Sequence, residues 1–154
     1  MLLCALAVSC SKSVKIPLNY RVETDKSVTG IVEDAYIPNT GSYHLKLVTK
    51  FLTGSTTDSV TLRLSGLPGV ISKNVDSIKG LPTYTADFIL TTNNAAYAVY
   101  PVSVIASVPG ETPQTYNFNI HVIPADCAAF LSGTWSGTNA CTARSYPYTL
   151  LSLI

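Results

Sequence analysis

One segment, Tyr116-Asn117-Phe118-Asn119-Ile120-His121-Val122, places an apolar side chain at every second position. Successive side chains of a β-strand point to opposite faces of a sheet, so this spacing is that of a half-buried strand. A helix would bring apolar side chains together at spacings of three and four, which this segment lacks. The segment therefore predicts a strand with one face in a core and the other toward solvent.

The same alternation recurs along much of the chain, in residues 43–51, 60–64, 84–90 and 100–108. Turn-forming sequences separate these segments, among them Thr53-Gly54-Ser55 and Pro109-Gly110. Short alternating strands joined by such turns are typical of two antiparallel sheets packed face to face. We therefore predict an all-β protein with an antiparallel β-sandwich.

The composition is that of a folded domain with little charge. Of the 154 residues, 47% are hydrophobic and 12% are charged, and the net charge is +1. The Lys and Arg residues are scattered, whereas nucleic-acid-binding proteins usually concentrate them on one face, so we expect no nucleic-acid partner. No stretch approaches the roughly 18 consecutive apolar residues of a transmembrane helix.

Two of the predicted strands carry a family resemblance. Residues 59–70, SVTLRLSGLPGV, resemble a strand and turn of bacterial immunoglobulin-like modules. Residues 100–107, YPVSVIAS, resemble their penultimate strand, and residues 116–123 resemble their final strand. The resemblance covers roughly residues 40–124 and implies an immunoglobulin-like β-sandwich. It implies no single function, because such modules serve as spacers, adhesins and accessory domains alike.

The start of the chain resembles a lipoprotein signal. An apolar run ends in Ala7-Val8-Ser9-Cys10, which is similar to the lipobox of bacterial lipoproteins, here of the Bacteroidetes envelope type. The resemblance implies that Cys10 is acylated, that the preceding peptide is removed, and that several acyl chains anchor the protein stably. It places the protein in the cell envelope, at the outer membrane, with the periplasmic and surface sides both open. The alternative is a buried first strand with a free cysteine, since no basic residue precedes the apolar run.

These signals divide the chain into four parts. We expect a signal peptide in residues 1–10, a flexible tether in 11–28, the sandwich in 29–124 and the start of a second, truncated β module in 125–154. An early strand is expected near residues 30–37. Pro124 ends the last alternating strand, and the Gly133-Thr134-Trp135 sequence after it is of a different style.

Two cysteines are left once Cys4 and Cys10 are assigned to the signal. Cys127 and Cys141 form an even pair in an oxidising compartment, so we predict a disulfide between them. Its loop of about 15 residues would stabilise the fold by roughly 3 kcal/mol. Two free thiols are the alternative.

Motifs for catalysis and for metal binding are missing from the sequence. There is no G-x-S-x-G, H-E-x-x-H or phosphate-binding glycine loop. His44 and His121 fall on polar faces of predicted strands, where solvated side chains are the rule. Asp25, Asp58 and Asp76 could hold Ca²⁺ only if the loops converged, and solvated Asp is far commoner. We predict no metal, no cofactor and no enzymatic activity.

A few aromatic residues depart from the inward-facing pattern. Tyr36, Tyr97 and Trp135 could be exposed and could stack on a sugar ring, whereas most other tyrosines fall on the core register. Two hypotheses for the function result. The first is a non-catalytic, membrane-anchored lipoprotein that acts as a structural or interaction module, its partners being the membrane and another envelope protein. The alternative is a surface glycan-binding protein.

Overall fold

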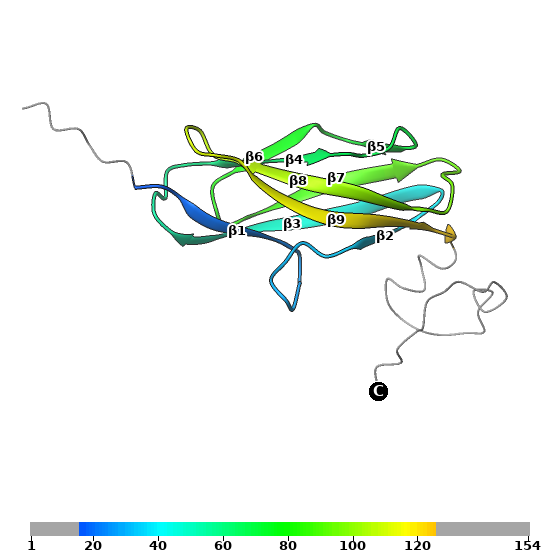
Figure 1. Ribbon diagram of the computed structural model, residues 1–154, viewed down its shortest axis with the longest axis horizontal. Helices are drawn as coiled ribbons and strands as arrows, with labels where there is room; N and C mark the ends of the chain where they lie inside the picture. Colours follow the sequence, from blue (N-terminus) through cyan, green and yellow to red (C-terminus); the bar gives the residue numbers. More distant parts are fainter. Residues whose placement is uncertain (1–15, 126–154) are drawn as a thin grey trace, which may run out of the picture.

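The structure, a computed structural model, describes residues 16–125, which form two β-sheets (Figure 1). The strands are β1 (Asn19–Thr24), β2 (Ala35–Pro38), β3 (Gly41–Thr53), β4 (Val60–Ser65), β5 (Ile71–Lys73), β6 (Ser77–Gly80), β7 (Tyr84–Thr92), β8 (Val99–Ser107) and β9 (Gln114–Ile123). The four-stranded sheet has the order β1-β3-β7-β5, and the five-stranded sheet has the order β2-β9-β8-β4-β6.

The core lies between the two sheets. Leu45 and Leu47 of β3 and Phe88 of β7 face it from one sheet, and Leu62 of β4 and Ile120 of β9 face it from the other. The polar residues between them point outward, as the alternation predicts. The chain is an immunoglobulin-like β-sandwich, and the predicted fold class is confirmed.

The predicted flexible tether is too long, because part of it belongs to the sandwich. Residues 19–24 form β1, which pairs with β3 from Asn19 opposite Thr53 to Thr24 opposite Leu47. Leu18, Tyr20 and Val22 alternate and are buried in the core. Little in the sequence indicates this strand, because the apolar alternation is short and the next residue, Glu23, is charged although it is buried.

We predicted an antiparallel sandwich, but one pair of strands is parallel. β2, which overlaps the end of the early strand expected near residues 30–37, runs parallel to β9 from Ala35 opposite Ile120 to Pro38 opposite Ile123. β2 lies in the five-stranded sheet while β1 and β3 lie in the other, so the chain crosses between sheets on both sides of β2. A parallel pair requires such a crossover connection, which local sequence does not reveal.

Buried tyrosines fill part of the core, as expected from their register. The Tyr20 hydroxyl donates to the Ala106 carbonyl at 3.3 Å, and the Tyr84 hydroxyl donates to the Val60 carbonyl at 2.9 Å. Both bonds cross from the four-stranded sheet to the five-stranded one. Burial raises the pKa of Tyr20 to about 12, because the phenolate would lose its hydration there.

A charged cluster lies on the outer face of the four-stranded sheet. Glu23 is only 2% exposed, and its carboxylate contacts the Arg21 guanidinium at 2.8 Å and the Lys50 ammonium of the neighbouring strand. The hydrogen bond from Lys50, assisted by both positive charges, outweighs burial and lowers the pKa of Glu23. The cluster therefore joins β1 to β3 through charge as well as through the backbone.

The first prediction concerns β1. Removing residues 1–24 should abolish cooperative unfolding in urea, because it strips Leu18, Tyr20 and Val22 from the core. Each buried apolar side chain contributes roughly 1.5–3 kcal/mol, and a domain has only about 5–15 kcal/mol in total. Removing residues 1–15 is the control and should leave a sharp transition. A sharp transition in the shorter protein would show that β1 is dispensable.

The second prediction concerns acid stability. Because the pKa of Glu23 is lowered in the folded protein, its ionised carboxylate stabilises the fold at pH values above the ordinary carboxyl pKa of about 4.3. This contribution is lost as the pH falls through the folded-state pKa. Glu23→Gln should therefore lower the free energy of unfolding at neutral pH by roughly 1–3 kcal/mol. The difference from the wild type should shrink in acid, measured by urea unfolding across pH. A difference that stays constant with pH would contradict the assignment.

A candidate binding face on the five-stranded sheet

The outer face of β9 presents three polar side chains in a row. Asn117, Asn119 and His121 alternate with the buried Phe118, Ile120 and Val122. β8 flanks β9 along all three positions, whereas β2 begins to pair with β9 only at Ile120. His121 lies between Val99 of β8 and Tyr36 of β2, and Asn119 lies beside Pro101 of β8.

Asp34, just before β2, joins two of these side chains. Its carboxylate accepts a hydrogen bond from the Asn119 backbone amide at 2.8 Å and from the Asn119 side-chain amide at 3.2 Å. Its second oxygen lies 3.0 Å from His121 Nε2. Partial burial raises the pKa of Asp34, but the hydrogen bonds from His121 and Asn119 outweigh it, and the net pKa is lowered. Asp34 thus fixes the orientation of both neighbours.

An aromatic pair extends this network. The rings of Tyr36 and His121 are stacked, with centroids 4.6 Å apart and planes 15° from parallel. Tyr36 remains 41% exposed, whereas the His121 side chain is 13% exposed. The histidine therefore supports the tyrosine ring from below, and the tyrosine presents an ordered aromatic surface to solvent.

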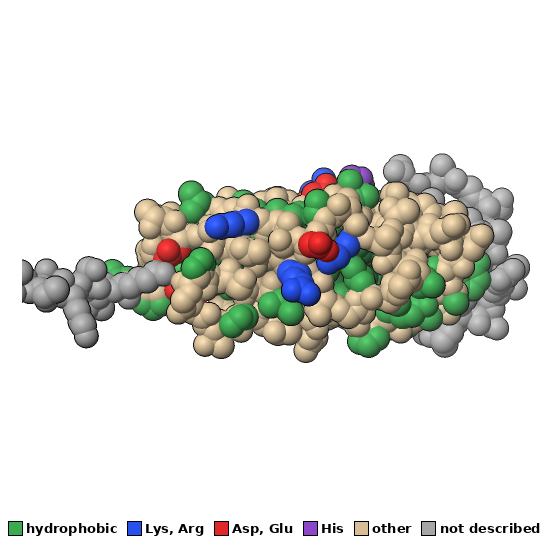
Figure 2. All heavy atoms as spheres, turned by 90° about the horizontal axis from the view of Figure 1, so that it is seen from above, with side chains coloured by type: hydrophobic (Ala, Val, Ile, Leu, Met, Phe, Trp, Pro, Cys, Tyr) green, Lys and Arg blue, Asp and Glu red, His purple; other side chains and the backbone are tan. Residues whose placement is uncertain are grey.

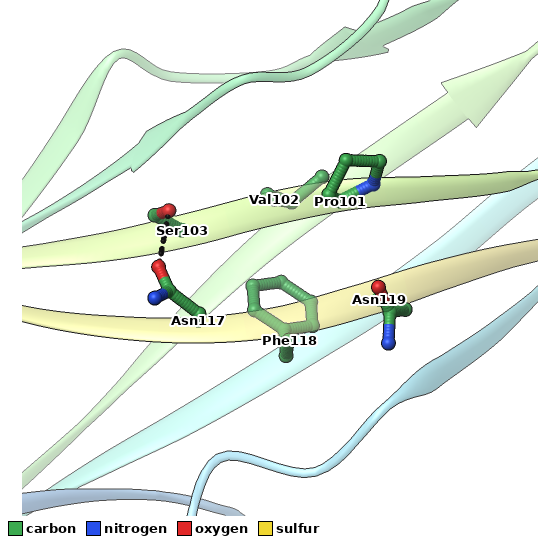
Figure 3. Close-up of a pocket in the computed structure, with 6 residues that line it drawn as sticks. All are labelled: Pro101, Val102, Ser103, Asn117, Phe118 and Asn119. Atoms are coloured by element: carbon green, nitrogen blue, oxygen red, sulfur yellow. Dashed lines mark hydrogen bonds between the residues drawn. The ribbon is translucent and has the colours of Figure 1, made fainter.

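A shallow hollow lies beside the pair on the same face (Figure 3). It has a volume of about 210 Å³ and is lined by Pro101, Val102, Ser103, Asn117, Phe118 and Asn119. Ser103 Oγ donates to Asn117 Oδ1 at 2.8 Å across the two strands. Asn119 lines the hollow and also shares Asp34 with His121, so hollow and aromatic pair form one continuous surface. We call this surface the β9 face.

The structure describes two of the three residues proposed for ligand binding, and it does not show them in contact. Tyr36 lies on the β9 face and Tyr97, 47% exposed, lies in the loop before β8, whose Ala98 carbonyl accepts a hydrogen bond from the Val122 amide. Trp135 lies outside the described residues, as do Cys10, Cys127 and Cys141. The lipidation and disulfide assignments therefore stay predictions.

The two histidines differ from one another. His44 is 55% exposed on the four-stranded sheet, with Asp87 at 2.9 Å, in agreement with a solvated side chain. The same prediction is wrong for His121, which is largely covered through its contacts with Asp34 and Tyr36.

The acidic loop residues do not form a site in the described part of the chain. Asp76 pairs with Lys73 at 3.3 Å, three residues away. Between residues 16 and 125, no group of three or more His, Cys, Asp or Glu side chains is placed to hold a metal ion. The predicted lack of a metal stays a prediction.

Sequence reasoning missed Asp34, Asn117, Asn119 and Ser103. The alternation of residues 116–122 already places Asn117, Asn119 and His121 on one outer face, which was the available signal. The contribution of Asp34 could not be found in this way, because it is 85 residues from Asn119 in the chain. The parallel pairing of β2 with β9 alone brings them together.

On the face shown in Figure 2, few Lys and Arg side chains are visible, and two of them lie next to an acidic group. In residues 16–125 we find no helix long and apolar enough to cross a membrane.

The solved structures compared with this chain are remote likenesses, all with TM-scores below 0.5. No model of a known family matches the chain, and no curated protein matches its sequence. Among solved structures, it is similar to WR4, a C. elegans member of the MSP family, with a TM-score of 0.49 and 6% identity over 66% of this chain and 97% of that one. The periplasmic chaperone SfaE is similar with a TM-score of 0.48 and 7% identity, over 70% of this chain and 57% of that one. A PapD-like domain of human CEP192 is similar with a TM-score of 0.41 and 12% identity, over 81% of this chain and 98% of that one.

The third prediction compares two Asp–His pairs. Asp34→Ala should lower the free energy of unfolding by about 1–2 kcal/mol, because it removes the partner of His121 and of the Asn119 backbone amide. Asp87→Ala is the matched control and should cost less than about 0.5 kcal/mol, because its pair with His44 is exposed. Hydrogen exchange should be faster in β2 of the first variant only. Equal effects of the two substitutions would show that Asp34 does not hold β2.

Proposed function

We propose that this protein is a non-catalytic lipoprotein of the cell envelope, in which Cys10 carries the lipid anchor and the sandwich is a rigid spacer or interaction module. The observation that carries the proposal is the position of the two ends of the sandwich. The chain enters at one end of the long axis and leaves at the other (Figure 1). A module with its ends so placed is suited to keeping the segments on its two sides apart.

The strand pairing gives the separation of the ends. Asn19, where β1 begins, lies opposite Thr53 at the end of β3. The Ile123 carbonyl at the end of β9 accepts a hydrogen bond from the Asn39 amide, two residues before β3 begins at Gly41. The entry and exit are therefore separated by the length of β3, whose 13 residues span about 40 Å.

The entry point is held firmly in the sandwich. The Leu18 amide donates to a Glu111 carboxylate oxygen at 3.0 Å, which ties it to the loop between β8 and β9. Gly54, with a φ of +104°, lies so close to Pro17 that a Cβ there would be 2.0 Å from the Pro17 carbonyl oxygen. A pull on residues 16–18 is thus transmitted to both sheets.

The link to the membrane is short in this arrangement. Only residues 11–18 lie between Cys10 and the start of β1. An extended chain spans at most about 3.6 Å per residue, so the sandwich stays within roughly 30 Å of the lipid-bearing cysteine. The spacer therefore stands close to the membrane on a short stalk.

The absence of catalysis is part of the proposal. The two histidines, His44 and His121, lie on the outer faces of different sheets, so they cannot act in one site. Each has an Asp as its hydrogen-bonding partner, and the His121 pair holds β2 to β9. In this proposal the His121 pair contributes to the fold, and neither pair takes part in a reaction.

The fourth prediction tests the anchor. When the protein is expressed from its own gene in a bacterial host fed labelled palmitate, the wild type should incorporate label and sediment with membranes. Cys10→Ala should lose both properties, because it removes the thiol that accepts the lipid. Cys4→Ala is the matched control and should be labelled like the wild type. An unlabelled wild type would refute the lipoprotein assignment.

A further inference from the structure

We propose that the β9 face binds a neutral, extended oligosaccharide. The observation behind this is that neutral hydrogen-bonding side chains line a hollow on the same sheet face as an exposed, supported aromatic ring, to which Asn119 and Asp34 connect it. This inference goes beyond the spacer role and does not depend on the lipid anchor, because it concerns only side chains of β2, β8 and β9 and the preceding Asp34.

The polar groups suit sugar hydroxyls, which both donate and accept hydrogen bonds. Asn117 accepts a hydrogen bond from the Ser103 hydroxyl through Oδ1. Its NH₂ group is then left to donate to a ligand, because the Asn117 side chain is exposed. Asn119 is held through its NH₂ group by Asp34, so its Oδ1 is left as an acceptor at a fixed position. One amide thus supplies donors and the other an acceptor, both at the hollow.

The aromatic ring suits the apolar face of a sugar. Stacking on an aromatic ring is favourable when one face is accessible and the ring is ordered. Tyr36 is 41% exposed and is stacked on His121, which Asp34 holds in turn. Since the groups are already fixed, binding costs little side-chain entropy.

The dimensions and charge of the strip select the ligand class. From Asn117 to His121 is four residues of one strand, or about 13 Å, which accommodates a short chain of sugars rather than a single ion. Asp34 and His121 are the ionisable groups of the strip, and they pair with one another. Pro101 and the 49% exposed Val99 form an apolar border. A neutral ligand therefore fits better than a phosphorylated or acidic one.

The fifth prediction tests the site with the full chain carrying Cys10→Ala, so that a failure of lipidation does not affect the result. Cellohexaose, xylohexaose and mannohexaose would be titrated separately to about 10 mM and followed by two-dimensional NMR of the backbone and Asn side-chain amides. We expect saturable shifts at Asn117 and Asn119 with at least one of the three. Tyr36→Leu and Asn117→Ala should each weaken that binding about tenfold or more.

Controls separate a binding role from a structural one. His44→Ala removes the exposed histidine of the opposite sheet and should bind like the parent protein. Asn117 is exposed, so its replacement tests the site even if a change at Tyr36 disturbs β2. No saturable shift with any of the three sugars, or binding that survives both Tyr36→Leu and Asn117→Ala, would overturn the proposal.

Discussion

The two sheets are joined where the chain passes from β2 to β3, and the hydrogen bonds of that crossing underlie the rest of the structure. Pro38 ends a strand of one sheet and Gly41 begins a strand of the other. Where the chain leaves one sheet for the other, the backbone carbonyls of Pro38 and Gly41 need hydrogen-bond donors from elsewhere. A buried polar group without a partner costs about 1–3 kcal/mol. The hydroxyl of the buried Thr92 donates to the Pro38 carbonyl oxygen at 2.7 Å, and it lies 3.4 Å from the Gly41 carbonyl oxygen. A single side chain of β7 therefore bridges the two sheets.

Other contacts hold the same turn on its remaining sides. The Asn39 amide donates to the Ile123 carbonyl at 2.8 Å, and the Asn39 carbonyl accepts the Ala95 amide at 2.9 Å. Thr40 exchanges hydrogen bonds with Asn94, which adopts a positive φ of 49°. The end of β9, the turn after β2 and the loop after β7 are thus one hydrogen-bonded unit. This unit sets the end of the sandwich from which the described chain leaves.

The crossing also creates the β9 face. β2 can lie parallel to β9 only because the chain leaves the four-stranded sheet after β1 and returns to it with β3. The passage places Asp34 beside Asn119 and His121, and it places Tyr36 over the histidine ring. The opposite sheet has the same chemical pair in His44 and Asp87, but no aromatic ring among residues 16–125 stacks on it and the histidine stays 55% exposed. Identical side-chain chemistry becomes a supported surface on one sheet and a solvated pair on the other.

The fold class and most of the core could be predicted from the order of the residues alone. The alternation at Leu45, Phe88 and Ile120 is a local property, because period-two spacing results from strand geometry whatever the partner strand. The same alternation identified which side chains of β9 point outward. The parallel place of β2, the membership of β1 and the pairing of Asp34 with His121 emerged only when the strands were assembled in three dimensions. These features depend on which strands become neighbours, and the contacts of Asp34 with β9 span 85 or more residues. Residue spacing within one segment carries no information about that choice.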